Sequence, residues 1–149
     1  KIPKKMFKKE DRILFLGRLA KDTGLPKFLE FLKEGSGEIR SRMSVDFCGD
    51  GPLASMCSKY GVVHGFIDPS GFLSKAKICV PSGYLSALEA FAYKCQVLVF
   101  SDNPLKRDYW EMTAFYKFIE SKDINGAFEW TKRQTWEKLA SLYINLWKA

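Results

Sequence analysis

The chain has 149 residues, of which 46% are hydrophobic and 28% are charged, and its formal net charge is +7. This length and composition are typical of one globular domain with a sizeable core. No apolar run approaches the roughly 20 residues that a membrane-spanning helix needs, and no signal-peptide pattern opens the sequence.

The cysteines and the single histidine do not form a metal or redox motif. The spacings between Cys48, Cys57, Cys79 and Cys95 match no paired zinc or disulfide-exchange pattern. Each cysteine lies in an apolar run, where a free thiol behaves as a small hydrophobe. With no Asp-x-Asp pair either, we expect buried, reduced thiols, no metal and a cytoplasmic location.

Positive charge is concentrated at the start of the chain. The first twelve residues carry four of the seven net positive charges. Pro3 and the lack of periodicity favour a solvated basic linker over residues 1–11, and contact with anionic lipid or nucleic acid is the alternative. Specific nucleic-acid binding is not expected, because no aromatic-lined basic face follows. Since the sequence begins at Lys1 rather than Met, we expect a domain excised from a longer protein.

Six apolar segments predict the strands of a sheet. The run at 12–17 is apolar on both faces and ends in glycine, as in a fully buried parallel strand. The other predicted strands are 45–48, 62–63, 78–80, 97–100 and 115–119. Predicted helices begin at Pro26 and after Ser86, and cover 53–57, 69–75, 106–111, 121–130 and 134–147. This alternation predicts an α/β fold: a Rossmann-like three-layer α/β/α domain with a six-stranded, mostly parallel sheet.

The segment from Pro81 to Ala90 is the most informative for function. Pro81 stops a strand, a loop of small residues follows, and the next apolar segment carries one carboxylate, Glu89. Open α/β sheets bind ligands at the carboxyl ends of their strands, where helix N-termini offer N–H groups to phosphate. The loops after Leu16 and around Gly49 belong to the same edge, and Arg18 there offers a forked cation suited to phosphate.

Two of these side chains also have purely structural interpretations. Ser86-x-x-Glu89 fits a capping box, in which Glu89 accepts a hydrogen bond from a backbone N–H at the helix start. Arg18 is equally able to pair with Asp22 or Asp50 on the surface. The sequence alone leaves both alternatives open.

Other conspicuous residues favour structural roles. The turn at 49–52 occurs widely without a ligand, and His64 beside a strand end is typical of a packed histidine. Trp130, Trp136 and Trp147 recur at intervals that suit helix packing better than base stacking, so we expect them in the core.

Five motifs occur in a fixed order along the chain. They are Gly17-Arg18-Leu19 with Gly24-Leu25, Gly49-Asp50-Gly51-Pro52-Leu53, Gly65-Phe66, Pro81-Ser82 and Leu88-Glu89-Ala90. Together they resemble the nucleotide-binding half of family 4 glycosyltransferases, and the stretch 136–143 is similar to the closing helix of that family. The resemblance runs from about Arg12 to the end of the chain. It implies one half of a GT-B architecture, in which two Rossmann-like domains face each other across a cleft.

The resemblance also implies roles for matching positions. Arg18 would contact the donor diphosphate and Glu89 the ribose hydroxyls, which makes these two the candidate catalytic residues. The implied donor-binding residues are Gly17, Lys21, Asp50, Gly65, Phe66, Ile67, Ser82, Gly83, Tyr84, Leu85 and Ser86. The substrate would be a UDP-, GDP- or ADP-sugar, with no cofactor and no metal, because cations and a helix dipole neutralise the leaving diphosphate.

The chain departs from the family pattern at two places. Thr23 stands where the family has lysine, with Lys21 close by. The loop between Ser82 and Glu89 is shorter than in the family and lacks its first glutamate, which in the family helps to hold the transferred sugar.

We therefore predict that residues 12–149 are the donor-binding domain of a retaining, metal-independent glycosyltransferase of polysaccharide or glycolipid biosynthesis, inactive in isolation. A missing N-terminal domain would bind the acceptor, and the basic leader would allow peripheral contact with the cytoplasmic membrane face. Two alternatives stay open. One is a GT-B nucleotide-sugar epimerase domain, and the other is a non-catalytic module for nucleotide binding or assembly.

Overall fold

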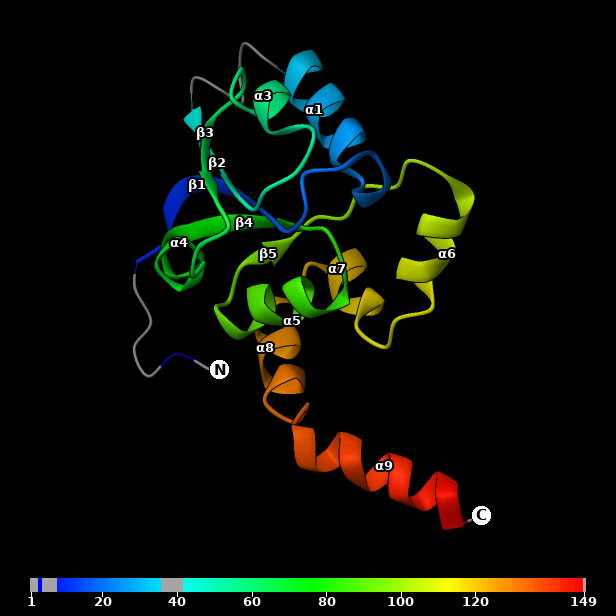
Figure 1. The fold of residues 1–149 in the computed structure, drawn as a ribbon. Coiled ribbons are helices and arrows are strands. Elements are labelled where there is room, and N and C mark those ends of the chain that lie inside the picture. The colour runs from blue at the N-terminus through cyan, green and yellow to red at the C-terminus, as the bar shows by residue number, and fades with distance from the viewer. Residues whose placement is uncertain (1–2, 4–7, 36–41, 149) are drawn as a thin grey trace.

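The computed structural model describes residues 3, 8–35 and 42–148, most of which fold around one sheet (Figure 1). Its strands are β1 (Glu10–Leu16), β2 (Ser44–Cys48), β3 (Val62–Gly65), β4 (Ala76–Pro81) and β5 (Gln96–Val97). They lie in the order β3-β2-β1-β4-β5, and every neighbouring pair is parallel. The predicted parallel α/β fold is confirmed, with five strands in place of six.

Helices cover both faces of this sheet. The helical elements are η1 (Lys21–Thr23), α1 (Leu25–Glu34), α3 (Ala54–Cys57), α4 (Ser70–Lys75), α5 (Tyr84–Ala92), α6 (Pro104–Glu111), α7 (Tyr116–Ser121), α8 (Ile124–Thr131) and α9 (Trp136–Lys148). One buried cluster joins the sheet to α1 and α3, and a second joins it to α4, α5, α6 and α8. Figure 1 shows α1 and α3 on one side of the sheet and α5 and α8 on the other.

The apolar run of β1 supplies both cores. Ile13 and Phe15 belong to the cluster on the α1 side, and Leu14 and Leu16 belong to the cluster on the α5 side. All four side chains are buried. Successive side chains of a strand point to opposite faces, so a central strand covered by helices on both faces needs an unbroken apolar sequence. Burying each of these side chains contributes about 1.5–3 kcal/mol.

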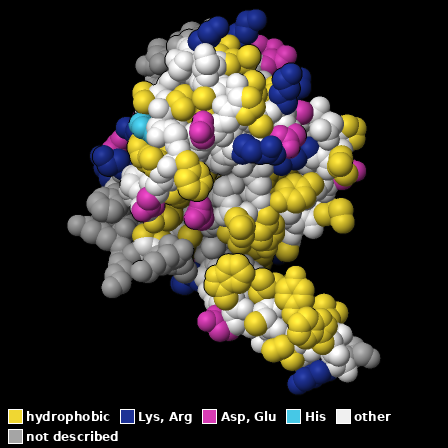
Figure 2. Space-filling view, viewed as in Figure 1, with side chains coloured by type: hydrophobic (Ala, Val, Ile, Leu, Met, Phe, Trp, Pro, Cys, Tyr) yellow, Lys and Arg dark blue, Asp and Glu magenta, His cyan; other side chains and the backbone are white. Residues whose placement is uncertain are grey.

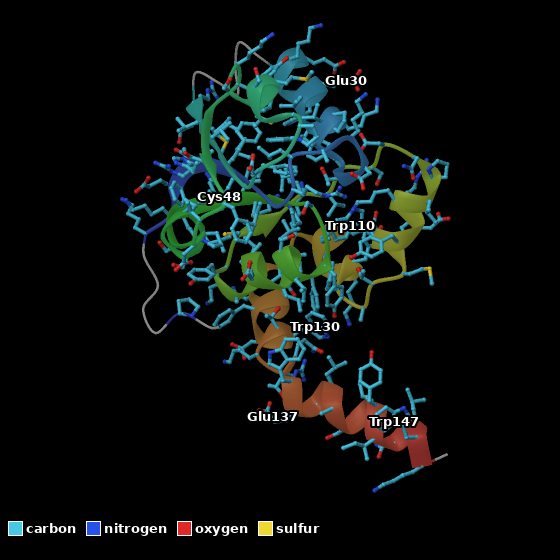
Figure 3. The ribbon with its side chains drawn as sticks, viewed as in Figure 1. Glu30, Cys48, Trp110, Trp130, Glu137 and Trp147 are labelled. Carbon is cyan, nitrogen blue, oxygen red and sulfur yellow. The ribbon has the colours of Figure 1, made fainter. Side chains whose placement is uncertain are left out.

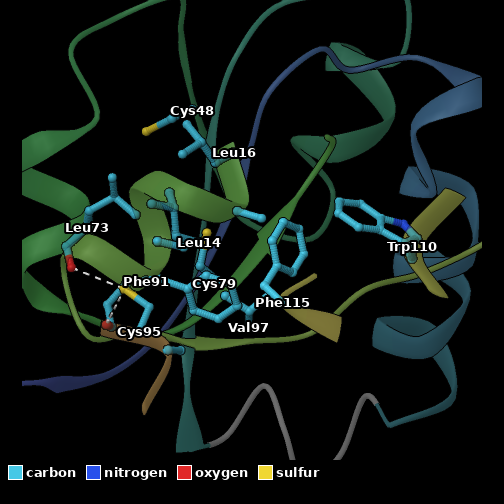
Figure 4. Packing of buried hydrophobic residues seen from close by; sticks show 14 residues of the cluster. Leu14, Leu16, Cys48, Leu73, Cys79, Phe91, Cys95, Val97, Trp110 and Phe115 are labelled. Carbon is cyan, nitrogen blue, oxygen red and sulfur yellow. Dashed lines mark hydrogen bonds between the residues drawn. The ribbon is translucent and has the colours of Figure 1, made fainter. Parts of the chain in front are cut away.

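The prediction of a strand at 115–119 is wrong, because this segment enters helix α7. Phe115, Phe118 and Ile119 are spaced by three and four residues, which is the period of a helix. Phe115 is buried and packs edge-on against Phe91 and Trp130, with ring centroids 5.4 and 5.8 Å apart. Figure 4 shows Phe115 between Phe91 and Trp110 in the core on the α5 side.

Two other predicted elements have different bounds in the structure. The strand predicted at 97–100 stops at Val97, and Phe100 instead packs against Phe28 with ring centroids 5.4 Å apart. The helix predicted at 121–130 begins at Ile124, because the Asp123 carboxylate accepts a hydrogen bond from Gly126 N–H at 2.9 Å and caps it.

The basic leader at 1–11 is only partly described. Residues 1–2 and 4–7 lie outside the described residues, and Glu10 and Asp11 belong to β1. The ammonium group of Lys9 donates to the carbonyl oxygen of Leu73 at 2.8 Å. The described end of the leader is therefore tied to the body of the domain beside α4.

Two of the three tryptophans expected in the core lie outside it. Trp130 is half-buried against Phe115 and Phe118, whereas Trp136 and Trp147 are 77% and 85% exposed. The reason is that α9 leaves the body of the domain and has no buried residue. Figure 3 shows Trp110 and Trp130 within the body and Trp147 on α9, apart from it.

Candidate functional site

Loops from neighbouring strands are joined by hydrogen bonds at the carboxyl edge of the sheet. Gly17 N–H, just after β1, donates to the carbonyl oxygen of Cys48 at 3.0 Å. Ser82 N–H, just after β4, donates to the carbonyl oxygen of Leu16 at 2.9 Å. The loop after β1 is thus fixed between the ends of β2 and β4.

Two glycines allow these loops to come this close. Gly17 has a φ of +130°, and a Cβ atom there would lie 1.8 Å from Ser82 Oγ. Gly49 has a φ of +156°, and its Cβ would lie 1.8 Å from the carbonyl oxygen of Gly17. Gly49 N–H also donates to the carbonyl oxygen of Gly65 at 2.8 Å, which adds the end of β3. The predicted meeting of the loops is confirmed, and it includes four strands.

The start of α1 connects to the loop after β5. Gly24 N–H donates to Asp102 Oδ2 at 2.7 Å. Thr23, at the position of the family's lysine, is buried and its hydroxyl donates to the carbonyl oxygen of Ala20 at 2.7 Å. Lys21 is exposed in η1. Thr23 is therefore part of the packing and offers no charge to the edge.

Arg18 forms one of the surface pairs that the sequence allowed. Its Nη2 lies 2.6 Å from Asp22 Oδ2, and the two side chains are 63% and 65% exposed. The pKa of Asp22 lies below its ordinary value because of a backbone hydrogen bond and the bond from Arg18. Asp50 does not pair with Arg18, because its carboxylate accepts from Gly51 N–H at 2.7 Å. An ion pair this exposed is weak, so an anionic ligand is able to compete for the guanidinium.

Helix α5 begins earlier than the capping box predicts. Its N-cap is Gly83, and Ser86 occupies the third helical position. Ser86 Oγ accepts from Gly83 N–H at 3.2 Å and donates to the carbonyl oxygen of Gly83 at 2.9 Å. The alternative in which Glu89 caps the helix is therefore wrong, since Glu89 lies in the second turn.

Glu89 is exposed, and its carboxylate has no hydrogen-bond or ion-pair partner within 3, 8–35 and 42–148. Burial raises its pKa above the ordinary value, and the negative charge of Asp68 adds to the shift. Glu89 thus has free acceptor oxygens, as a carboxylate that binds ribose hydroxyls requires.

The remaining predicted site residues lie on the same loops and on the first turn of α5. Phe66 is 94% exposed, Ile67 and Leu85 are also exposed, and Tyr84 is half-buried. Tyr84 N–H donates to the hydroxyl oxygen of Tyr109, from α6, at 2.9 Å. Exposed apolar side chains of this kind offer a surface for a flat ring such as a base.

A cavity of about 810 Å³ lies between α5 and the last two helices. Its lining includes Leu85, Leu88 and Glu89 of α5 and Trp136, Leu139 and Leu142 of α9. The glycine loops after β1, β2 and β3 do not line it. The cavity is therefore a neighbour of the predicted site and shares Tyr84, Leu85 and Glu89 with it. Figure 2 shows hydrophobic side chains gathered along α9.

Sequence reasoning missed Lys106. Its ammonium group donates to the carbonyl oxygen of Ser82 at 2.8 Å. A signal was present: Asn103 and Pro104 form a helix-start signature, and Asn103 Oδ1 accepts from Lys106 N–H at 2.9 Å. Since β5 is parallel to β4, the helix after β5 begins at the same edge as the predicted site.

The histidine and the cysteines are structural. His64 Nε2 lies 2.6 Å from Asp46 Oδ1, and the ring packs on Phe72 with centroids 4.3 Å apart, so the prediction of a packed histidine is confirmed. All four cysteines are buried and free. Burial raises the pKa of Cys48 and Cys57 to about 11, which keeps these thiols protonated and unreactive.

Two absences concern the described part of the chain. Its residues contain no group of three or more His, Cys, Asp or Glu side chains placed to hold a metal ion. None of its helices combines the length and the apolar character needed to cross a membrane. The metal-independence of the site stays a prediction.

No family model matches the sequence, and no curated protein matches it either. Solved structures match the fold. The match to TarM from S. aureus covers 100% of this chain and 38% of the TarM chain, with a TM-score of 0.66 and 14% sequence identity. The pneumococcal O-GlcNAc transferase GtfA, in complex with UDP and GlcNAc, matches over 93% of this chain and 35% of its own, with a TM-score of 0.63 and 11% identity.

A third match is of similar size to this chain. It is the C-terminal domain of the glycosyl transferase group 1 family protein LpcC from Francisella tularensis, with a TM-score of 0.54 and 17% identity. The match covers 81% of this chain and 84% of that domain. The chain thus has the fold of a Rossmann-like domain of GT-B glycosyltransferases, and it spans little more than a third of the TarM and GtfA chains.

Replacing Gly17 by alanine tests the contact between the loops. The new Cβ would overlap Ser82 Oγ, and alanine is strained at a φ of +130°. We expect Gly17→Ala to lower the free energy of unfolding by about 1–3 kcal/mol in urea denaturation. The matched control is Gly71→Ala in α4, where no atom lies within 4 Å of the new Cβ and we expect a gain of about 0.5–1 kcal/mol. Equal unfolding midpoints for both variants would contradict the tight contact.

Replacing Glu89 by glutamine tests the effect of its ionised carboxylate on stability. The folded state raises the pKa of this acid, so ionised Glu89 lowers stability as pH rises through that pKa. We expect Glu89→Gln to raise the melting temperature at pH 7 and to match the wild type below the pKa of an unfolded glutamate, about 4.3. Melting curves between pH 3.5 and 8 check this. A lower melting temperature for the variant at pH 7 would show instead that the ionised carboxylate stabilises the fold.

Proposed function

We propose that this chain is the donor-binding domain of a family 4 glycosyltransferase, the C-terminal one of two Rossmann-like domains. It binds a nucleoside diphosphate sugar and holds it for transfer to an acceptor. The observation that carries the proposal is the meeting of the loops after β1, β2 and β4 with the end of β3 at one sheet edge, with side chains excluded at Gly17 and Gly49. Such bare backbone lets a diphosphate approach closely.

The charged groups of this edge support the assignment of roles. Arg18 is held only by an exposed pair with Asp22, so its guanidinium is able to bind the diphosphate. Among the described residues the Glu89 carboxylate has no bonded partner, so its acceptor oxygens are open to the ribose hydroxyls. The exposed ring of Phe66 on the loop after β3 borders the base. Retention of configuration and metal-independence belong to this proposal through the resemblance alone.

The choice of nucleotide follows the structural neighbours. TarM and GtfA both crystallised with UDP. UDP is therefore the first ligand to test, with GDP and ADP as alternatives. Because such donors are made in the cytoplasm, the proposal includes a cytoplasmic location.

A second domain is the proposed partner. Helix α9 carries exposed apolar side chains along its length, among them Trp136, Leu142 and Trp147. A continuous exposed apolar face of this kind marks an interaction surface. The matching TarM and GtfA chains are much longer than this one. We propose that the acceptor-binding domain contacts this part of the chain in the whole protein.

A module that binds the nucleotide without transferring sugar is the second candidate. The Tyr109 hydroxyl takes up the Tyr84 N–H at the start of α5, and Gly83 N–H is bonded to Ser86. Two amides that would otherwise face a diphosphate are thus occupied. Nucleotide binding without transfer or hydrolysis of the donor in the full-length protein would favour this candidate.

Titration with UDP, GDP and ADP, followed by calorimetry or NMR, tests the proposal. We expect one of them to bind with a dissociation constant at or below the millimolar range. Arg18→Ala and Glu89→Ala should each weaken that binding about tenfold or more, because hydrogen bonds to charged groups contribute about 1.5–3 kcal/mol.

The controls remove the same charges elsewhere. Lys77→Ala changes an exposed lysine at the amino end of β4, and Glu120→Ala changes an exposed glutamate of α7. Neither should alter binding by more than about twofold. Failure of all three nucleotides at millimolar concentration contradicts the proposal. Unchanged affinity for Glu89→Ala would remove the ribose role from that residue.

A further inference from the structure

Helix α6 brings a lysine to the loop after β4. The Lys106 ammonium group donates to the carbonyl oxygen of Ser82 and lies over the rings of Tyr109 and Trp110, at 5.1 and 5.2 Å from their centroids. Trp110 is only 1% exposed, so it anchors α6 in the core. The position of Lys106 on α6 is therefore fixed by packing, and its ammonium group faces two aromatic rings.

The charge of Lys106 has no ion-pair partner among the described residues. No carboxylate in that part of the chain lies within ion-pair distance of its Nζ, and Ser82 is its hydrogen-bond acceptor there. Burial lowers the pKa of Lys106, the charges of Asp22 and Asp102 raise it, and the charge of Arg18 lowers it. A partly buried ammonium group without a bonded anion is costly, and a bound anionic ligand would supply that partner.

The two carboxylates near Lys106 already have other partners. Asp22 pairs with Arg18 at 2.6 Å, and Asp102 accepts from Gly24 N–H at 2.7 Å. An ammonium group has three donors, and Ser82 uses one of them. Two N–H donors of the Lys106 ammonium group are therefore left for a ligand at the loop after β4.

Two backbone N–H groups at the start of α5 already have hydrogen-bond acceptors within the domain. Gly83 N–H is bonded to Ser86 Oγ at 3.2 Å, and Tyr84 N–H is bonded to the Tyr109 hydroxyl at 2.9 Å. With these amides occupied, the neutralisation of an anion here depends on the side chains. Lys106 contacts the loop after β4 through the Ser82 carbonyl, and the charge of Arg18 acts on Lys106.

We propose that Lys106 is a diphosphate-binding residue of this site and forms, with Arg18, the pair of cations that holds the two phosphates of the donor. This inference rests on the proposed function and deepens it. Lys106 supplies the second positive charge that Thr23, buried on the Ala20 carbonyl, does not. The ligand is recognised by its charge, so inorganic diphosphate binds the same pair of side chains.

The purely structural alternative is that Lys106 only ties α6 to the Ser82 carbonyl. Lys106→Gln separates the two roles, because glutamine keeps a hydrogen-bond donor and loses the charge. Lys106→Arg keeps the charge. Lys77→Gln is the matched control, since it removes one positive charge at the opposite, amino end of β4, where Lys77 pairs with Asp11.

The experiment measures the affinities of wild type and variants for UDP, inorganic diphosphate and uridine by calorimetry or NMR, with melting curves to verify folding. We expect Lys106→Gln to weaken UDP and diphosphate binding about tenfold and to leave uridine binding unchanged. Lys106→Arg and Lys77→Gln should stay within about threefold of the wild type. The effect of Lys106→Gln should shrink as salt rises, because salt screens the pair of charges.

The outcomes distinguish the two proposals. If the wild type binds UDP and the folded Lys106→Gln variant binds UDP and diphosphate as tightly, Lys106 is a structural tie and this inference fails alone. If the wild type binds diphosphate through Lys106 and UDP no better than diphosphate, the anion site stands and the nucleotide function fails. If the wild type binds neither UDP nor diphosphate, both proposals fail.

Discussion

The contact between Gly17 and its neighbours is the constraint on which the rest of the site depends. A Cβ atom on Gly17 would meet the Ser82 side chain, and a Cβ on Gly49 would meet the Gly17 carbonyl. Because both side chains are absent, the loops after β1, β2 and β4 lie against one another, with Gly65 hydrogen-bonded to Gly49. Protein interiors are close-packed and yield little, so this backbone surface is rigid.

The charged forms of Glu89 and Lys106 are disfavoured in the folded protein. The Glu89 carboxylate has no bonded partner among the described residues, and the Lys106 ammonium group is partly buried and feels the charge of Arg18. Each of these arrangements favours the uncharged form of the group concerned. Groups with shifted pKa values are typical of a binding site, where the ligand supplies the missing partners. Under the proposed function, a diphosphate would pair with the cations and a ribose would bind the carboxylate.

The sequence predicted the sheet well because the strands of a buried parallel sheet are apolar on both faces. It failed where burial depends on tertiary context. Phe115 is buried, but the spacing to Phe118 belongs to a helix, and the apolar run alone suggested a strand. Trp147 is apolar and exposed, since α9 has no buried residue among those described. Lys106 reaches the site only because Trp110 anchors α6 in the core, and no local pattern encodes that long-range contact.

The most direct test of the account is where a nucleotide binds. Addition of UDP to ¹⁵N-labelled protein shifts the backbone amide signals of the residues that it contacts. The account predicts shifts at Gly17, Gly49 and Ser82, on the glycine loops. Shifts confined to Leu139 and Leu142, which line the cavity between α5 and α9, would contradict it and move the binding site away from the sheet edge.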